Sequence, residues 1–312
     1  MNKIAEILKK SDNILIISHK KPDGDTLGSA FALCYTLRDM GKNCAVTCLD
    51  KVTPKYLFLS EGKEKLDFDF RPDLVISVDC ASSEMIDKEL IEKYGVDICI
   101  DHHEINGNFA RYSYVEKDSA AVGEIIFNLI NLLTDKISKK VADCLYTAIS
   151  TDTGCFRYSN TTDRTLLIAS KLVELGADNK KLNKLLFETV TKAQFEIERK
   201  AFETINFYYD GKIATMKITQ KMLLETGATP DDIDNISSLP RKIEGVEAAI
   251  TLRENPDGSI KVSARSGEKV DVSKVCKDVC SGGGHKRAAG GTIFSDIEKA
   301  EKLFIEYFKE VF

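Results

Sequence analysis

The chain has 312 residues, of which 43% are hydrophobic and 30% are charged, and its formal net charge is -5. This composition is that of a globular protein and predicts one or two domains, each with its own core. An acidic chain is not expected to coat long duplex nucleic acid, because that binding depends on neutralising phosphates with basic residues. The acidic net charge remains compatible with small phosphorylated ligands and short oligonucleotides.

Residues 1–13 have the pattern of an amphipathic helix, with Ile4, Ile7 and Leu8 on one face, and not that of a signal peptide. No stretch approaches the length of an apolar membrane span, so we expect a cytoplasmic protein without membrane contact. The nine cysteines include no pair with C-x-x-C spacing, and most lie in apolar runs. They are therefore interpreted as reduced, buried residues and not as a structural zinc site or a disulfide framework.

Residues 1–190 begin with an alternation of short apolar runs and helical patterns. The runs at 14–18, 44–49, 74–79 and 96–101 are continuous apolar segments, as buried parallel strands are. From about residue 119 the pattern is mainly helical. The sequence therefore predicts an α/β domain with a mainly parallel sheet and flanking helices.

The pattern changes after residue 190. The heavily charged stretch 191–208 is interpreted as a helix that connects two domains. Residues 209–312 contain two predicted hairpins, one around Asp210-Gly211 and one around Pro256-Asp257-Gly258, and end in a helical pattern. They predict a smaller C-terminal α+β domain.

The four histidines of the chain lie beside aspartates or glycines, at the end of a predicted strand or in a loop. In open α/β sheets, ligands bind beyond the carboxyl ends of the strands, where such side chains can converge. Taken singly, each of these segments could also be a turn with an aspartate helix cap. Together they give a mixed set of carboxylate and imidazole candidates: His19, Asp23, Asp25, Asp79, His103 and Asp152.

Oxygen and nitrogen ligands without thiolates favour manganese, iron, cobalt or magnesium over structural zinc. Several carboxylates in one crevice repel each other unless cations neutralise them. We therefore expect two divalent metal ions, with Mn²⁺ as the first choice and Mg²⁺ or Co²⁺ as alternatives. Sites with two metal ions activate water for phosphoester hydrolysis. Gly28 and Ser29, at the start of a predicted helix, could place backbone N–H groups near a phosphate.

Four motifs occur in this order: HKKPDGDTLGS, VDC, DHHE and TDTGCFRYSNTT. The motif GGGHKRAAGG follows at 282–291. Together they resemble the ordered motifs of the DHH phosphoesterases and of the C-terminal substrate-binding domain associated with them, over nearly the whole chain. The resemblance implies one metal ion held by His19, Asp23 and Asp79, and a second held by Asp25, Asp79, His103 and Asp152, with Asp79 bridging.

The resemblance also implies roles for the residues around the metal ions. Asp101 would orient a neighbouring histidine, and His102 would face the reacting phosphate. The two domains would face each other with the substrate between them. The expected substrate-binding residues are Ser29 and Arg157 of the first domain and Arg265, Gly283, Gly284 and His285 of the second.

Within that family, the architecture without additional domains resembles the oligoribonucleases that degrade very short RNAs. The sequence therefore predicts a metal-dependent phosphoesterase that hydrolyses short single-stranded RNA to mononucleotides and 3′-phosphoadenosine 5′-phosphate (pAp) to AMP. A phosphodiesterase for cyclic di-AMP or linear pApA is the alternative within the family, and a homodimer is compatible with the resemblance. A non-catalytic nucleotide-binding module, from a different class, would predict a gap in the ligand set, and the sequence shows none.

Overall fold

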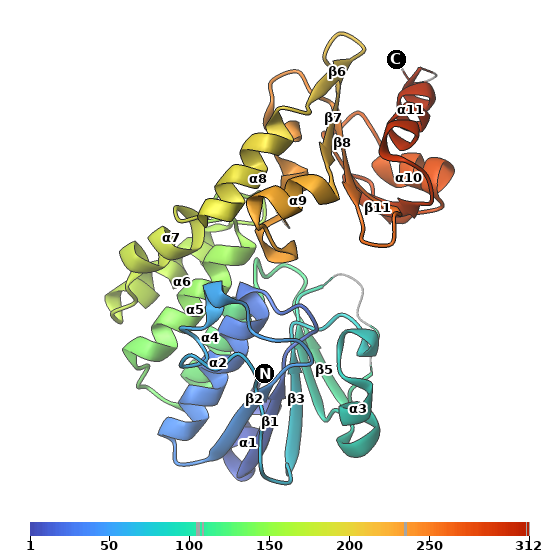
Figure 1. The fold of residues 1–312 in the computed structure, drawn as a ribbon. Helices are drawn as coiled ribbons and strands as arrows, with labels where there is room; N and C mark the ends of the chain where they lie inside the picture. The colour runs from blue at the N-terminus through green and yellow to red at the C-terminus, as the bar shows by residue number, and fades with distance from the viewer. Residues whose placement is uncertain (104–106, 108, 234–235, 310, 312) are drawn as a thin grey trace. The chain divides into compact units, whose positions relative to one another are not determined.

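The computed structural model describes residues 1–312 except 104–106, 108, 234–235, 310 and 312. The chain divides by its internal contacts into two units, Met1–Thr189 and Val190–Phe312 (Figure 1). Among the described residues, no helix combines the length and the apolar character that a bilayer crossing requires. None of the nine cysteines, all of them among the described residues, forms a disulfide, and most of them are buried.

The first unit is built on a five-stranded sheet in which all pairings are parallel, with the order β2-β1-β3-β4-β5. The first four strands in the chain confirm the four apolar runs of the sequence. The fifth, β5, was not predicted, because its residues lie at an edge of the sheet and are only partly buried. The strands are β1 (Asn13–Ile17), β2 (Asn43–Thr47), β3 (Leu74–Val78), β4 (Ile98–Asp101) and β5 (Tyr112–Val115).

Both faces of this sheet are covered by apolar side chains. Ile14 and Ile16 of β1 enter a core with helices α1, α2, α4 and α5, while Leu15 and Ile17 enter a second core beside α3. Figure 1 shows these helices on the two sides of the sheet. The helices are α1 (Asn2–Lys10), α2 (Gly24–Asp39), α3 (Lys88–Tyr94), α4 (Val122–Leu133), α5 (Lys139–Asp152), α6 (Asp163–Glu174) and α7 (Asn179–Phe187).

Helices α2 and α5 pack closely, and Gly28 lies at the contact. A Cβ atom on Gly28 would lie 2.5 Å from the carbonyl oxygen of Cys144, so a larger residue would push the helices apart. This close contact matters for function because α2 carries Asp25 in its first turn and α5 ends at Asp152.

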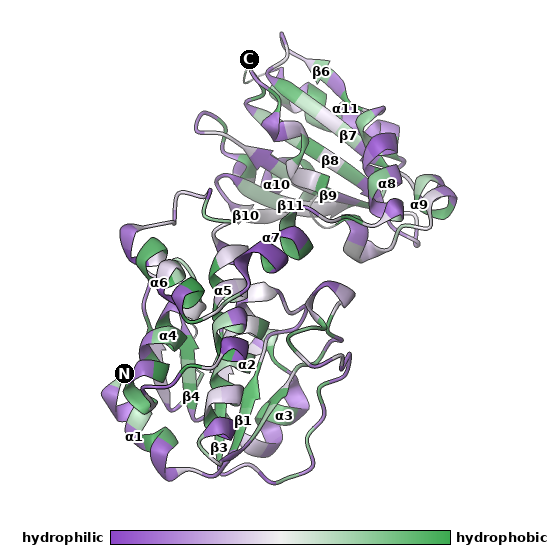
Figure 2. Cartoon of the chain, turned by 90° about the vertical axis from the view of Figure 1, so that its left-hand side faces the viewer, coloured by the Kyte–Doolittle hydropathy of each residue, from purple (hydrophilic) through white to green (hydrophobic). Residues whose placement is uncertain are grey.

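The second unit contains a six-stranded mixed sheet with the order β10-β11-β9-β8-β7-β6, in which β7 and β8 are parallel and the other pairs are antiparallel. Both predicted hairpins are present, as β6–β7 and β8–β9. Figure 2 shows the hydrophobic colour along β1 and β4 of the first sheet and along β8 of the second. The strands are β6 (Asn206–Tyr208), β7 (Ile213–Ile218), β8 (Ala248–Glu254), β9 (Ile260–Ser266), β10 (Gly283–His285) and β11 (Ala288–Ile293).

The charged stretch after residue 190 belongs to the second unit. Its helix α8 (Lys192–Phe202) buries Ile197 and Ala201 against Met216 of β7, and residues 206–208 form strand β6. The remaining helices are α9 (Gln220–Thr226), α10 (Val272–Cys280) and α11 (Ile297–Phe308). Short 3₁₀ turns occur at Pro54–Tyr56, Ser83–Met85, Pro230–Ile233, Ile236–Ser238 and Pro240–Lys242.

Candidate metal centre

The candidate metal centre lies at the carboxyl end of the parallel sheet. His19 follows β1, Asp79 follows β3, Asp101 ends β4, and His102 and His103 come directly after it. The chain passes from β1 to β2 on one side and then to β3 on the other. Such a reversal of strand order opens a crevice beyond the carboxyl ends, which is where ligands bind in open α/β sheets.

Two helices bring the remaining carboxylates to the same edge. Asp23 is the N-cap of α2, and its Oδ1 accepts hydrogen bonds from the backbone N–H groups of Asp25 and Thr26 at 3.0 and 3.1 Å. Asp25 lies in the first turn of α2, and Asp152 is the last residue of α5. The close packing of these two helices thus places their carboxylates together.

Within the part of the chain that the structure describes, the candidate ligand atoms form three overlapping groups, in each of which the atoms lie within 4.8 Å of one another. Asp79 and His102 each occur in two of these groups. Because each group has the ligand number and spacing that one cation needs, the overlap favours adjacent cations that share a carboxylate. The groups are His19, Asp23 and Asp79; Asp79, His102 and His103; and Asp25, His102 and Asp152.

Asp79 shows the need for a cation most directly. Its side chain is buried, and its Oδ1 has no hydrogen-bond partner among the described residues. Its backbone has a φ of +57°, in the left-handed region that costs a non-glycine residue about 1 kcal/mol or more. A buried carboxylate oxygen without a partner is unfavourable unless a cation neutralises it, so this residue fits a metal-bridging position.

His19 and His102 are oriented by backbone carbonyls. Nδ1 of His19 lies 2.8 Å from the Lys20 carbonyl, and Nδ1 of His102 lies 3.0 Å from the Ser119 carbonyl. In each ring Nδ1–H donates and the Nε2 lone pair is left for a metal ion. Nε2 of His19 is 3.6 Å from Asp79, and Nε2 of His102 is 3.7 Å from Asp79 and 3.6 Å from Asp152.

His103 is arranged differently. Its Nδ1 lies 2.7 Å from Oδ1 of the buried Asp101, so the ring nitrogen nearest Asp79, at 3.7 Å, already has a hydrogen-bond partner. The side chain is 42% exposed, and among the described residues no hydrogen bond reaches its Nε2, so this nitrogen is accessible to a ligand from solvent. The geometry therefore gives His102 the neighbours Asp25 and Asp152 that the sequence assigned to His103, and it leaves His103 as the more exposed of the two.

The carboxylate of Asp25 is fully buried and accepts three hydrogen bonds. It accepts hydrogen bonds from the backbone N–H groups of Val122 and Gly123, at 2.7 and 3.0 Å, and from the Ser29 hydroxyl at 3.0 Å. Ser29 is itself buried, so this geometry does not favour the phosphate contact expected for it. The supporting groups of residues 119–123 were missed by the sequence analysis, since backbone groups carry no sequence signal.

Burial, together with the charges of neighbouring carboxylates, raises the pKa values of Asp25 and Asp152. Burial raises the pKa of Asp152 to about 6, with His102 opposing this shift and Asp79 adding to it. Burial, followed by the charges of Asp79 and Asp152, raises the pKa of Asp25 well above its usual range. Cations would replace these protons, and carboxylate oxygens with imidazole nitrogens are donors that Mn²⁺, Mg²⁺ and related ions accept. The residues present therefore fit divalent cations.

Metal binding is expected to strengthen with rising pH. Burial lowers the pKa of His19, but the carboxylates of Asp79 and Asp23 outweigh it and raise the pKa to about 9. Below pH 9 a cation must displace that proton, whereas Asp152 is already largely ionised above pH 6. Because Asp25 also gives up a proton, the affinity for Mn²⁺ should rise by at least about tenfold per pH unit between pH 6.5 and 8.5. Calorimetric titration in buffers of different ionisation enthalpy measures the released proton, and a pH-independent affinity would contradict the prediction.

Two of the predicted substrate residues of the second unit, Arg265 and His285, lie in one row of its sheet. Arg265 on β9 pairs with Ala288 on β11, and Ala288 pairs with His285 on β10. Paired residues of neighbouring antiparallel strands share a face, so Arg265 and His285 flank a small alanine. Gly284, with a φ of +141°, is required there, since a Cβ would lie 2.6 Å from the Ala288 carbonyl oxygen.

A polar hollow of about 540 Å³ extends along the same strands. Arg265, Lys261 and Ser263 of β9 line it together with Gly283 and the glycines of β11. Positive charge and exposed backbone suit a phosphorylated ligand. Arg157, the predicted partner from the first unit, is exposed, and its Nε donates to the Gly154 carbonyl at 2.6 Å.

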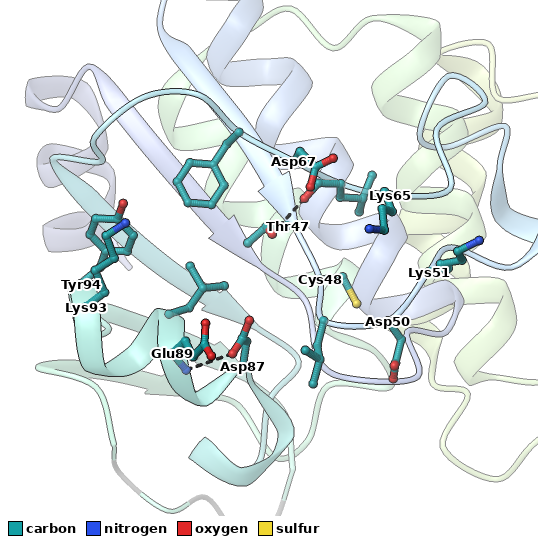
Figure 3. A pocket seen from close by; sticks show the side chains of 14 residues that line it. Thr47, Cys48, Asp50, Lys51, Lys65, Asp67, Asp87, Glu89, Lys93 and Tyr94 are labelled. Atoms are coloured by element: carbon teal, nitrogen blue, oxygen red, sulfur yellow. Dashed lines mark hydrogen bonds between the residues drawn. The ribbon is translucent and has the colours of Figure 1, made fainter.

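A separate hollow of about 360 Å³ lies beyond β2, on the α3 side of the first sheet (Figure 3). Lys51 and Lys65 lie on one side of it, and Lys93 and Tyr94 lie on the other. None of the predicted site residues lines it. Its lysines are balanced by acidic side chains, among them Asp87, so its charge favours no particular ligand.

Residues 13–149 match the DHH family, N-terminal domain, and residues 210–311 match the DHHA1 domain. The chain belongs to the DHH family. It is 31% identical to the bifunctional oligoribonuclease and PAP phosphatase NrnA of Thermus thermophilus, an alignment that covers 99% of this chain and 94% of that protein. It is 26% identical to the cyclic-di-AMP phosphodiesterase PdeA of Listeria monocytogenes, in an alignment that covers 97% of this chain but only 48% of PdeA.

A solved structure is similar over nearly the full chain. The exopolyphosphatase-related protein from Bacteroides fragilis superimposes with a TM-score of 0.90, covering 99% of this chain and 96% of that one, at 25% sequence identity. The fold with its two units is thus shared by a chain of closely similar length.

Proposed function

We propose that this protein is a metal-dependent phosphoesterase that hydrolyses very short RNA to mononucleotides and pAp to AMP. The observation that carries the proposal is the set of overlapping ligand groups around Asp79, whose buried Oδ1 has no partner among the described residues. The substrate class is supported by the similarity to the oligoribonuclease and PAP phosphatase of Thermus thermophilus over nearly the whole length of both proteins.

The proposed ligands follow the geometry. His19, Asp23 and Asp79 hold one cation, and Asp25, His102 and Asp152 hold the second together with Asp79. Two bound divalent cations, Mn²⁺ as the first choice, would supply Lewis-acid activation of water and neutralise charge on the phosphoryl oxygens. His103, oriented by Asp101, presents Nε2 to the substrate and donates a hydrogen bond to the developing negative charge.

The second unit is proposed to bind the phosphate and the nucleoside of the substrate. Arg265 supplies a fork of N–H donors that matches two phosphate oxygens, and His285 supplies a further donor on the same face. The backbone N–H groups of Gly283 and Gly284 add donors that a phosphate can approach closely, because glycine has no side chain. Binding through a phosphate and few bases suits a ligand of one or two nucleotides.

Arg265→Ala is expected to raise KM for a dinucleotide about 10- to 100-fold with a smaller change in kcat. A charge-assisted hydrogen bond to phosphate contributes about 1.5–3 kcal/mol, and the bond exists in both the bound substrate and the transition state. Steady-state kinetics measures the effect. Arg199→Ala removes an arginine of α8 whose partners are Glu196 and Glu203, and it should leave KM unchanged. An Arg265→Ala enzyme with unchanged KM would remove Arg265 from the substrate site.

The test of function is a parallel assay of the purified protein with Mn²⁺, Mg²⁺ or Co²⁺. The substrates are a 5′-labelled RNA dinucleotide, a 24-nucleotide RNA, pAp, cyclic di-AMP and pyrophosphate. We expect the dinucleotide and pAp to be hydrolysed fastest, and Mn²⁺ to support the highest rate. Faster hydrolysis of cyclic di-AMP would favour the alternative to which the similarity with the Listeria phosphodiesterase points. Metal binding without turnover of any substrate would favour a nucleotide-binding module.

A further inference from the structure

The segment 116–124 supports two of the proposed metal ligands at once. The Ser119 carbonyl fixes the ring of His102, and the N–H groups of Val122 and Gly123 fix the carboxylate of Asp25. The groups that contact His102 and Asp25 are backbone atoms, so their positions depend on the contacts that fix segment 116–124. A shift of the segment would move His102 and Asp25 together.

One side chain outside the segment contacts it at three points. The guanidinium group of Arg164, in the first turn of α6, donates to the Glu116 carboxylate and, through Nη2 at 3.0 Å, to the Ser119 hydroxyl. Its Nε lies 3.3 Å from Oε2 of Glu124. The planar guanidinium group presents its donors in fixed directions, so it donates to Glu116 and Ser119 while its charge lies beside Glu124.

Glu124 is the anchor of this arrangement. It is fully buried in the first turn of α4, and its Oε1 accepts a hydrogen bond from the Thr165 hydroxyl at 2.6 Å. Among the described residues, no hydrogen bond reaches its Oε2, which leaves Arg164 as the charge beside that oxygen. A buried carboxylate is costly without a compensating cation. The presence of a buried glutamate inside the apolar stretch of α4 therefore points to a role for the pair beyond packing.

We propose that Arg164 and Glu124 are positioning residues for the metal centre, which they serve by fixing segment 116–124. Both residues lie outside the motifs that carry the proposed ligands. The pair acts through the Ser119 carbonyl on His102 and through the start of α4 on Asp25. The inference rests on the proposed function for its effect on catalysis, but its effect on metal affinity can be measured without a substrate.

The variant is expected to affect one of the two proposed cation sites and not the other, which allows a specific test. His102, Asp25 and Asp152 define the site that the segment supports, whereas His19 and Asp23 belong to the other site and are held by different groups. Loss of a supporting group typically weakens metal binding about 10- to 100-fold. Arg164→Met should therefore weaken one of the two Mn²⁺ equivalents by about tenfold or more, and change the other much less. General destabilisation would not separate the two sites in this way.

The experiment is calorimetric titration of metal-free protein with Mn²⁺, with thermal unfolding measured on the same samples. Arg164→Met leaves Glu124 as an uncompensated buried charge. The double variant Arg164→Met/Glu124→Gln removes that charge, while the amide oxygen of the new side chain can still accept from Thr165. Arg164→Lys keeps a positive charge beside Glu124 and should restore part of the lost affinity. Lys171→Met, which removes an exposed ion pair with Glu174 on the same helix, is the matched control.

Selective weakening of one equivalent in the double variant, with partial recovery in Arg164→Lys, supports the inference. Wild-type affinity for both equivalents in either folded variant that carries Arg164→Met would overturn it. A wild-type protein that binds two Mn²⁺ ions but hydrolyses none of the substrates would overturn the proposed function and leave this inference standing.

Discussion

Asp79→Asn is expected to reduce kcat for the RNA dinucleotide and for pAp by at least about 10³-fold. The asparagine side chain keeps the size of Asp79 but loses the charge that the proposed bridging position requires. Cations at such sites contribute several kcal/mol to transition-state stabilisation, and each 1.36 kcal/mol corresponds to a tenfold change in rate. Steady-state kinetics with saturating Mn²⁺ measures the loss, and calorimetric titration should show that both metal equivalents bind more weakly.

Asp73→Asn is the matched control for this variant. Asp73 directly precedes the same strand, at its amino end, where its exposed carboxylate accepts hydrogen bonds from Asn13. Removing its charge should leave kcat and metal affinity close to those of the wild type. An Asp79→Asn protein that retained wild-type kcat would exclude the bridging role and with it the two-cation arrangement.

His102→Ala and His103→Ala are expected to damage the enzyme in different ways. His102→Ala removes a proposed ligand and should weaken one Mn²⁺ equivalent together with turnover. His103→Ala should leave both equivalents bound and lower kcat by about 10²- to 10³-fold, which is the usual effect of losing one donor to developing negative charge. Calorimetric titration and kinetics on the same preparations separate the two effects.

The opposite result is equally informative. If His103→Ala lost a metal equivalent while His102→Ala kept both, the assignment made from the sequence would stand, and the arrangement of the two rings in the structure would not represent the metal-bound protein. The expectation for the two variants depends on which ring nitrogen of each histidine already has a hydrogen-bond partner. Nδ1 of His102 is held by a carbonyl 3.0 Å away, which frees Nε2 toward Asp152, whereas Nδ1 of His103 is held by Asp101.

Much of the fold could be predicted from local sequence patterns. Strands β1 to β4 are buried on both faces, so each appears as an unbroken apolar run. Strand β5 lies at the edge with partly exposed residues, and no such run marks it. The charged helix α8 resembles a connecting helix in sequence, but two apolar residues, Ile197 and Ala201, pack it into the second unit.

The sequence by itself determined which residues gather at the site. Each candidate follows an apolar run or begins or ends a helix, and the carboxyl ends of parallel strands meet at one edge of the sheet. The chemical character of the site also follows from residue type, since carboxylates and imidazoles together favour divalent cations over structural zinc. These features depend on short-range patterns that can be read along the chain.

Only the tertiary structure decided how the site residues divide their roles. Which nitrogen of His102 is free depends on a carbonyl 17 residues away, and the environment of Asp25 depends on N–H groups 97 and 98 residues away. The part played by Arg164 arises in the same manner, from a helix 45 residues beyond Ser119. Hydrogen bonds between distant segments form only once the cores have packed, so no local pattern of the sequence records them.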